Sequence, residues 1–147
     1  MILYLDSSAL VKFYVEERSS AEVLQTYREA QQAATAVISR VEVSAGLAKA
    51  QRMGRVPGTD ARRALDLFRK EWPRIAHVRV DEGLVARADS FAWEYGLRGY
   101  DAVHLAAGLN WQESLGLQVW LATFDEALWR AAEIAGLRAW PEGFGSG

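Results

Sequence analysis

Four acidic residues each lie where a short apolar stretch gives way to a helical pattern. They are Asp6 in YLDSSAL, Glu42 in SRVEVSAG, Asp101 in GYDAVHLAAG and Asp125 in ATFDEAL. If the strands run parallel, their carboxyl ends meet at one edge of a sheet, where open α/β folds bind their ligands. Carboxylates gathered there repel one another and stay ionised only with cations between them. Hard oxygen ligands without thiols favour Mg²⁺, with Mn²⁺ as a substitute.

A site of this kind is suited to the hydrolysis of a phosphodiester bond. The reaction needs an activated water, neutralisation of the charge that develops around phosphorus, and help for the leaving oxygen. One or two divalent ions can supply all three. We therefore interpret Asp6 and Asp101 as the central metal ligands, with Glu42 and Asp125 completing the site, directly or through waters.

Helix capping offers a structural explanation for the same acids. Acidic side chains are enriched in the first turn of a helix because they interact favourably with its dipole, and Asp6 and Asp101, taken singly, fit that position. Glu42 follows Ser39 at the spacing of a capping box. Asp81 has the same appearance and is expected to be only a cap. The number of such acids and their surroundings, rather than any one of them, favour the catalytic interpretation.

Two hydroxyl residues and a neighbouring acid complete the candidate site. Ser7 and Thr123 could hydrogen-bond the metal shell or the phosphate, although both also fit as capping residues. Thr123 and Glu126 fit a capping box, so either Asp125 or Glu126 could face the metal while the other caps the helix. His104 lies one helical turn after Asp101 and is expected to pack beside the site rather than to transfer a proton.

Short β-prone runs alternate with amphipathic segments along the whole chain, and no two-residue hairpin turn separates them. This alternation predicts a parallel sheet with helices on both faces. A single domain is expected over residues 1–140, followed by a flexible tail at 141–147. Strands are expected at 2–5, 33–38, 75–80, 119–122 and 137–140, and helices at 7–15, 19–30, 39–53, 60–71, 81–95, 125–135 and from 99 past 109.

Composition excludes several classes of protein. The 147 residues contain no cysteine and only two histidines, which argues against disulfides and a zinc site. No apolar run approaches the length of a membrane span, so a cytoplasmic protein is expected. The net charge of −2 argues weakly against nucleic acid, but bound cations would cancel the four clustered acids.

The densest basic stretch of the chain has two possible roles. Its arginines could hold RNA phosphates beside an acidic pocket that would otherwise repel RNA. They could equally form a solvated helical face. The candidates for RNA binding are Arg52, Arg55, Arg62 and Arg63.

The four acid-bearing segments, in this order, resemble those of the PIN-domain nucleases, in particular the VapC-like toxins of type II toxin–antitoxin pairs. The resemblance extends from about residue 2 to residue 140 and rests on YLDSSALVKFYVEE, SRVEVSAGLAKA, YDAVHLAAG and LATFDEALWRAAEIAGL. It implies a PIN-like three-layer α/β/α sandwich with a central parallel sheet of about five strands. It also implies a metal-dependent endoribonuclease with RNA as substrate, a cognate antitoxin as partner and a homodimeric state.

Two other functions fit parts of the pattern. A phosphoacceptor or phosphatase also carries an acid at the end of its first strand, but it requires a second acid where this chain has Ser7 or Ser8. A non-catalytic RNA-binding or scaffold module would have the same fold, although the complete acidic set argues against it. Cleavage of RNA distinguishes the nuclease from the scaffold, and release of phosphate from a small ester would favour the phosphatase.

Overall fold

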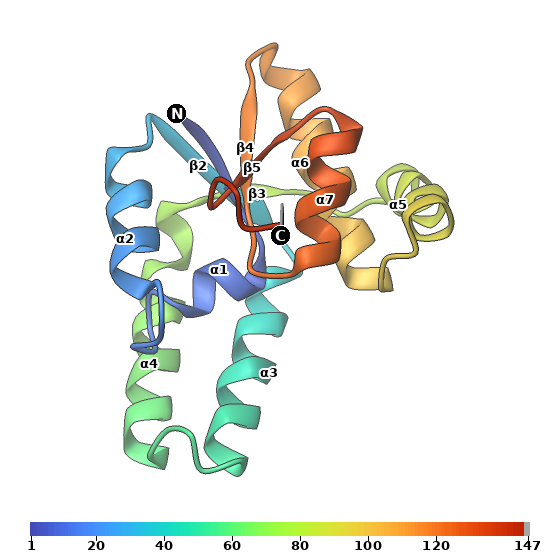
Figure 1. The fold of residues 1–147 in the computed structure, drawn as a ribbon. Helices are drawn as coiled ribbons and strands as arrows, with labels where there is room; N and C mark the ends of the chain where they lie inside the picture. Colours follow the sequence, from blue (N-terminus) through green and yellow to red (C-terminus); the bar gives the residue numbers. More distant parts are fainter. Residues whose placement is uncertain (146–147) are drawn as a thin grey trace.

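Five parallel strands form one sheet at the centre of the computed structural model, which describes residues 1–145 (Figure 1). Their order is β3-β2-β1-β4-β5, so the first strand of the chain lies in the middle. The register pairs Leu5 of β1 with Ala122 of β4, which places the residues that follow these strands side by side. The strands are β1 (Ile2–Leu5), β2 (Gln32–Ala36), β3 (Ala76–Val78), β4 (Val119–Ala122) and β5 (Arg138–Trp140).

Helices cover both faces of the sheet, which confirms the predicted three-layer sandwich. Ile2 and Tyr4 pack on one side with α5, α6 and α7, while Leu3 and Leu5 pack on the other with α1 to α4. All four β1 residues are buried because both faces of a parallel sheet are covered. The helices are α1 (Ser7–Val11), α2 (Ser20–Glu29), α3 (Ser39–Arg52), α4 (Gly58–Glu71), the 3₁₀ turn η1 (Trp72–Arg74), α5 (Glu82–Tyr95), α6 (Gly99–Leu115) and α7 (Glu126–Ala135).

Helix α6 lies close against the centre of the sheet and carries one of the candidate acids. Gly108 makes this approach possible: a Cβ there would lie 3.1 Å from Leu137 and 3.5 Å from Leu121. Buried residues run along α6 from Asp101 to Leu109. The helix extends to Leu115, where Gly116 ends it with φ of +65°.

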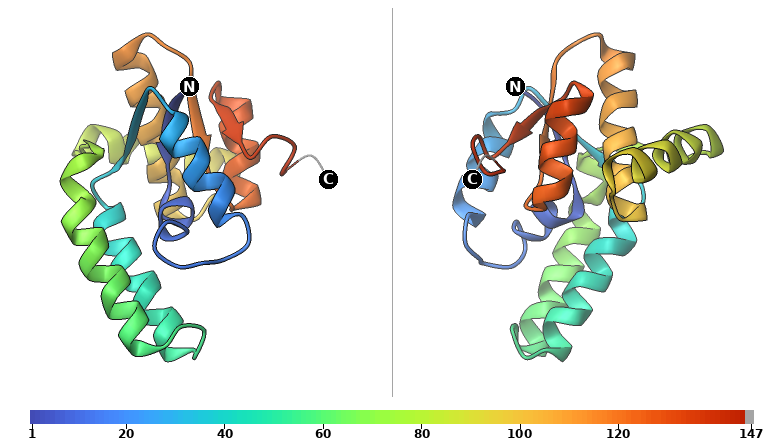
Figure 2. Two further views of the ribbon diagram at one scale, coloured as in Figure 1. Left: turned by 90° about the vertical axis from the view of Figure 1, so that its left-hand side faces the viewer. Right: turned by 45° about the vertical axis from the view of Figure 1, so that its right-hand side comes forward.

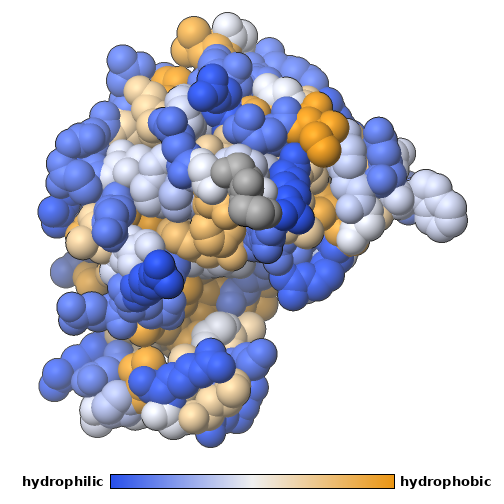
Figure 3. All heavy atoms as spheres, viewed as in Figure 1, coloured by the Kyte–Doolittle hydropathy of each residue, from blue (hydrophilic) through white to orange (hydrophobic). Residues whose placement is uncertain are grey.

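Helices α3 and α4 form a hairpin that projects away from the sheet (Figures 1 and 2). The side chain of Glu42 lies near the sheet end of this hairpin, whereas the basic residues around the turn lie farther out. The space-filling view shows apolar side chains in the hollow between the hairpin and the body of the molecule (Figure 3). The hairpin therefore forms one wall of a groove that begins at the candidate site.

Several element boundaries differ from those predicted: β2 spans Gln32–Ala36 rather than 33–38, and α4 begins at Gly58 rather than at residue 60. Helix α1 ends at Val11 rather than at residue 15, because the aromatic rings that follow turn into the core: Phe13 lies 4.9 Å from Tyr27, and Tyr14 lies 5.3 Å from Phe68. The strand predicted at 75–80 is limited to Ala76–Val78. No helix within residues 1–145 is long and apolar enough to cross a membrane.

The segment predicted as a tail makes contacts up to residue 145. Trp129 Nε1 donates a hydrogen bond to the Pro141 carbonyl at 2.8 Å, and Arg130 Nε donates to the Gly145 carbonyl at 2.9 Å. The ring of Phe144 lies 5.9 Å from that of Phe124. Residues 146–147 of the predicted tail lie outside the described residues.

Candidate active site

Asp6 and Thr123 meet where the central strands β1 and β4 end. Thr123 Oγ1 donates to Asp6 Oδ2 at 2.5 Å. The other carboxylate oxygen, Oδ1, accepts from Ser8 Oγ at 2.6 Å and from the Ala9 amide at 2.9 Å. Asp6 is only 2% exposed. It therefore caps α1, as the structural explanation requires, and also presents a buried carboxylate at the carboxyl edge of the sheet.

Glu42 is held by a chain of buried side chains rather than by a capping box. Ser39 does not cap α3, because its hydroxyl pairs with Thr35 Oγ1 at 2.6 Å. Glu42 Oε1 instead lies 2.7 Å from His104 Nε2, and the second imidazole nitrogen lies 2.7 Å from the Tyr4 hydroxyl. A carboxylate only accepts hydrogen bonds, so Nε2 carries the proton. The two contacts on opposite sides of the imidazole hold the ring between Tyr4 and Glu42 and fix the direction of Glu42.

Ser7 is also a partner of Glu42, donating from Oγ to Oε2 at 3.2 Å. The predicted contact of Ser7 with the site is therefore made through Glu42. His104 is 1% exposed and touches Glu42 directly, so it positions an acid instead of only filling space.

Asp101 and Asp125 are bridged by the guanidinium of Arg98. Arg98 Nε donates to Asp101 Oδ2, and its Nη2 donates to Asp125 Oδ2, both at 2.9 Å. Asp101 lies in the first turn of α6 without capping it, whereas Asp125 caps α7 through its Oδ1 and the Leu128 amide. One positive charge is thus shared between two of the four acids.

Asp125 and Glu126 have different partners in the structure. Asp125 both caps α7 and reaches Arg98, whereas Glu126 pairs with Arg130 one turn along α7. Thr123 does not form the expected capping box with Glu126, because its hydroxyl oxygen accepts from the Asp125 amide at 3.1 Å while its proton goes to Asp6.

Burial governs the electrostatics of the two central acids. Loss of solvent raises the pKa of Asp6, and the nearby His104 and the hydrogen bonds to the carboxylate only partly oppose this. Burial also raises the pKa of Asp101. Hydrogen bonding to Arg98 lowers the pKa of Asp101, whereas the charges of Asp125 and Asp6 raise it further. The negative charge of each carboxylate is therefore only partly compensated.

Burial also raises the pKa of Tyr4. Its complete burial and the charges of Asp6 and Glu42 raise the pKa of the phenol well above its usual value. The hydroxyl of Tyr4 therefore keeps its proton beside His104 Nδ1.

The four acids do not form the single cluster expected from the sequence. Within residues 1–145, no three histidine, cysteine, aspartate or glutamate side chains are arranged to hold a metal ion. The physical reason is that hydrogen bonds to the protein already engage each carboxylate, as described above. The donor set nevertheless fits a hard divalent cation, because it consists of carboxylate oxygens, and burial raises the pKa of two of these carboxyl groups.

The predicted basic residues take different positions around the site. Arg55 lines a groove of about 440 Å³ that also includes Ser7, Glu42 and Lys49. Arg63 lines an adjacent pocket together with Arg55. Arg62 pairs with Asp66 and its side chain is 70% exposed. Arg52 is exposed at the end of α3.

Sequence reasoning missed two residues of the site, Arg98 and Tyr4. Arg98 precedes Asp101 by three residues at the start of a helix, a spacing that brings side chains together and that could have identified it. Tyr4 alternates with leucines in an apolar strand, so nothing in the local pattern sets it apart from core residues.

Comparison with known proteins identifies a family model and several relatives. Residues 3–134 match the model of the PIN domain. Ribonuclease VapC46 of Mycobacterium tuberculosis is 30% identical over 135 residues, which cover 92% of this chain and 93% of the relative. Ribonuclease VapC45 of the same species is 30% identical over 140 residues, covering 95% of each chain.

Solved structures with the same fold are more distant in sequence. VapBC2 from Rickettsia felis, solved bound to a promoter DNA fragment, matches with a TM-score of 0.63 and 14% identity over 95% of this chain and 97% of that one. FitAcB from Neisseria gonorrhoeae has a TM-score of 0.63 and 18% identity, with coverages of 95% and 96%. These likenesses concern the fold alone.

Proposed function

Because this chain belongs to the PIN-domain family, we propose that it is a metal-dependent endoribonuclease that acts as the toxin of a toxin–antitoxin pair. The observation that carries the proposal is the placement of two buried carboxylates, Asp6 and Asp101, at the carboxyl edge of the sheet. The names of the relatives, which are ribonucleases, support RNA as the substrate. Such a substrate places the activity in the cytoplasm.

Each residue has a distinct part in the proposed mechanism. A bound Mg²⁺ or Mn²⁺ ion would supply an activated water and neutralise charge on the phosphate. Asp6 and Asp101 would hold the ion, with Glu42 and Asp125 completing its shell. Thr123 fixes the direction of the Asp6 carboxylate. The remaining positioning is done by Ser7, Tyr4 and His104, which direct Glu42.

Chelation tests the proposal directly. The purified protein should cleave RNA in the presence of Mg²⁺ or Mn²⁺, and EDTA should abolish cleavage because the ion provides the water and the charge neutralisation. Cleavage is measured on a labelled generic RNA, and activity should return when excess metal is added back. Binding of RNA without any metal-dependent cleavage would instead support the non-catalytic module. Release of phosphate from a small ester without RNA cleavage would support the phosphatase.

We propose that RNA approaches along the groove between α1 and α3. The groove begins at Ser7 and Glu42 and reaches Lys49 and Arg55 near the turn of the α3–α4 hairpin. An acidic site alone repels a polyanion, so cations along the approach are needed to hold the phosphates. Arg63 borders the same region through the adjacent pocket, and Arg52 is exposed nearby.

Arg55→Gln should flatten the salt dependence of RNA affinity, whereas Arg62→Gln should not. The slope of log affinity against log salt should fall by about 0.7, the value for one phosphate contact on a single strand. Arg62 is the matched control because it lies across the hairpin turn, on α4, and pairs with Asp66. Binding is measured in the Asp101→Asn background so that the RNA stays intact. Equal slopes for Arg55→Gln and its parent would show that Arg55 is only a solvated residue of the turn between α3 and α4.

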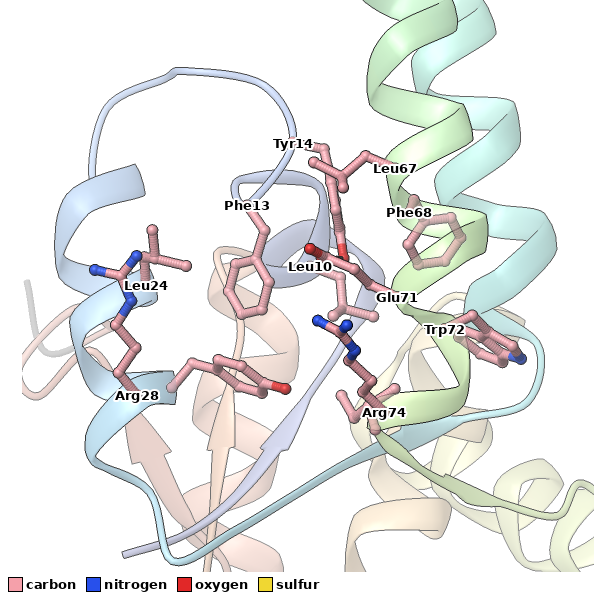
Figure 4. Close-up of a pocket in the computed structure, with 12 residues that line it drawn as sticks. Leu10, Phe13, Tyr14, Leu24, Arg28, Leu67, Phe68, Glu71, Trp72 and Arg74 are labelled. Atoms are coloured by element: carbon pink, nitrogen blue, oxygen red, sulfur yellow. Dashed lines mark hydrogen bonds between the residues drawn. The ribbon is translucent and has the colours of Figure 1, made fainter.

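An apolar pocket on the α1, α2 and α4 side of the molecule is a candidate surface for the antitoxin. Phe13, Leu24 and Phe68 contribute apolar side chains, and Arg28 and Arg74 stand at its edge (Figure 4). Its volume is about 320 Å³. We propose that an amphipathic segment of the antitoxin packs here, with acidic residues toward the two arginines. A solved structure with a similar fold, a toxin–antitoxin complex from Klebsiella pneumoniae, supports such a partner.

We also propose that the protein is a homodimer, as the family resemblance implies. Helix α5 offers exposed apolar side chains for such an interface, with Trp93 exposed to 92% and Val85 to 47%. Exposed aromatic residues of this size are enriched in interfaces.

A further inference from the structure

Arg98 holds one carboxylate oxygen of each of two acids that would bind the ion. It uses two N–H groups of one guanidinium to bridge Oδ2 of Asp101 and Oδ2 of Asp125, at 2.9 Å each. The other oxygen of Asp125, Oδ1, accepts from the Leu128 amide to cap α7. An ion that approaches the two acids therefore meets the positive charge of Arg98 at both Oδ2 atoms.

We propose that Arg98 competes with the metal ion for Asp101 and Asp125 and leaves them when the ion binds. The inference rests on the proposed metal-dependent function. A guanidinium places one positive charge between two carboxylates, whereas a divalent ion places two charges there, so the ion compensates the pair more completely. Arg98 thus lowers the affinity of the site for metal and keeps the two acids paired in its absence.

The exposure of Arg98 makes this exchange possible. Its side chain is 62% exposed, whereas that of Asp101 is 7% exposed. The exposed guanidinium is hydrated when it leaves, and the incoming ion replaces it as the partner of the buried carboxylate. The ring of Tyr100 lies 5.0 Å from the guanidinium and offers a cation–π surface that does not depend on the acids. The buried acid is fixed, and the exposed arginine is the partner that moves.

A purely structural bridge is the competing explanation, and the chain contains one that serves as a control. Arg87 on α5 donates to Glu113 on α6 at 2.9 and 2.7 Å and to Asn110 at 2.6 Å. Its guanidinium also lies 5.5 Å from an aromatic ring, that of Phe91. Arg87 therefore matches Arg98 in charge, bidentate pairing and ring contact, but it lies outside the candidate site.

Titration of the intact protein with Mn²⁺, by calorimetry and by the electron paramagnetic resonance signal of free Mn²⁺, tests the exchange without RNA. Arg98→Gln should bind Mn²⁺ more tightly than the wild type by up to about fivefold, the scale of one solvent-accessible ion pair. Arg98→Lys keeps the charge but loses the planar fork that bridges both acids, so its affinity should lie between the two. Arg87→Gln should bind like the wild type.

Thermal melting gives a second readout. In EDTA, Arg98→Gln should melt below the wild type, because two carboxylates lose their shared cation. Addition of Mn²⁺ should raise its Tm by more than it raises that of the wild type.

Equal Mn²⁺ affinity in Arg98→Gln, Arg87→Gln and the wild type would overturn the exchange and leave a structural bridge. Equal tightening in Arg98→Gln and Arg87→Gln would also overturn it, because the effect would then be one of net charge. Failure of every variant to bind Mn²⁺ would refute the metal-dependent function and this inference with it.

Discussion

Asp6→Asn and Asp101→Asn should each reduce RNA cleavage by at least about 10²-fold, because each removes a charged ligand from a site that depends on its ion. Both replacements keep the size of the side chain. Asparagine is also a good capping residue, so residue 6 would still accept from the Ala9 amide and α1 would remain folded. Initial rates of cleavage of a labelled RNA, measured in Mg²⁺ and in Mn²⁺, give the result.

Asp81→Asn is the matched control for this loss. Asp81 caps α5 by accepting from the Leu84 amide at 2.9 Å, the same geometry with which Asp6 caps α1. It has no predicted role in the site, so its replacement should leave cleavage unchanged. Full activity of Asp6→Asn and Asp101→Asn in a preparation free of other nucleases would show that these acids are caps and nothing more.

In EDTA at neutral pH, Asp101→Asn should melt at or above the wild type. Burial and the charges of Asp125 and Asp6 raise the pKa of Asp101 despite Arg98, so ionised Asp101 opposes folding. Asparagine removes that charge. A gain of a few degrees is expected, since about 1 kcal/mol moves the Tm of a domain of this size by about 2–4 °C. Mn²⁺ should then raise the Tm of the variant by less than it raises that of the wild type, because one ligand is missing.

The change in stability with pH shows whether the ionised Asp101 carboxylate opposes folding. A carboxyl whose pKa is raised by folding stabilises the protein below its unfolded pKa of about 3.9, and this contribution is lost as pH rises through the folded value. The wild type should therefore lose stability relative to Asp101→Asn as pH rises from acid toward neutral. Thermal scans across that range in EDTA measure the difference. A variant that melts below the wild type at every pH would show that the Arg98 pair outweighs the cost of burial.

The fold was accessible from the sequence because local patterns determine most of it. Apolar runs predicted all five strands, and the match to the PIN-domain model confirms the family that the four acid-bearing segments indicated. The residue at which helix α1 ends could not be predicted from the sequence, because it depends on the packing of Phe13 and Tyr14 against α2 and α4. Those contacts join residues far apart in sequence, and no local propensity reports them.

The site was only partly predictable for the same reason. The sequence predicts capping boxes at Ser39 and Thr123, and both are absent. The Ser39 hydroxyl pairs with Thr35, and the Thr123 hydroxyl donates to Asp6. The bridge from Arg98 to Asp125 depends on how α6 packs against α7. The spacing of the acids predicted a single cluster, which residues 1–145 do not form, and it did not predict which protein donors engage each carboxylate.

The central position of β1 in the sheet has a consequence for the nascent chain during translation. The hydrogen bond between Thr123 and Asp6 joins residues 117 positions apart, across the parallel pair of β1 and β4. A parallel pair cannot form until the crossover between its strands is complete. A ribosome that has translated the chain only as far as α5 therefore displays Asp6 and Glu42 without Asp101, Thr123 or Asp125. The amino-terminal part alone therefore cannot form the candidate active site. The ribosome that makes the chain is not exposed to a complete nuclease until synthesis has passed Asp125.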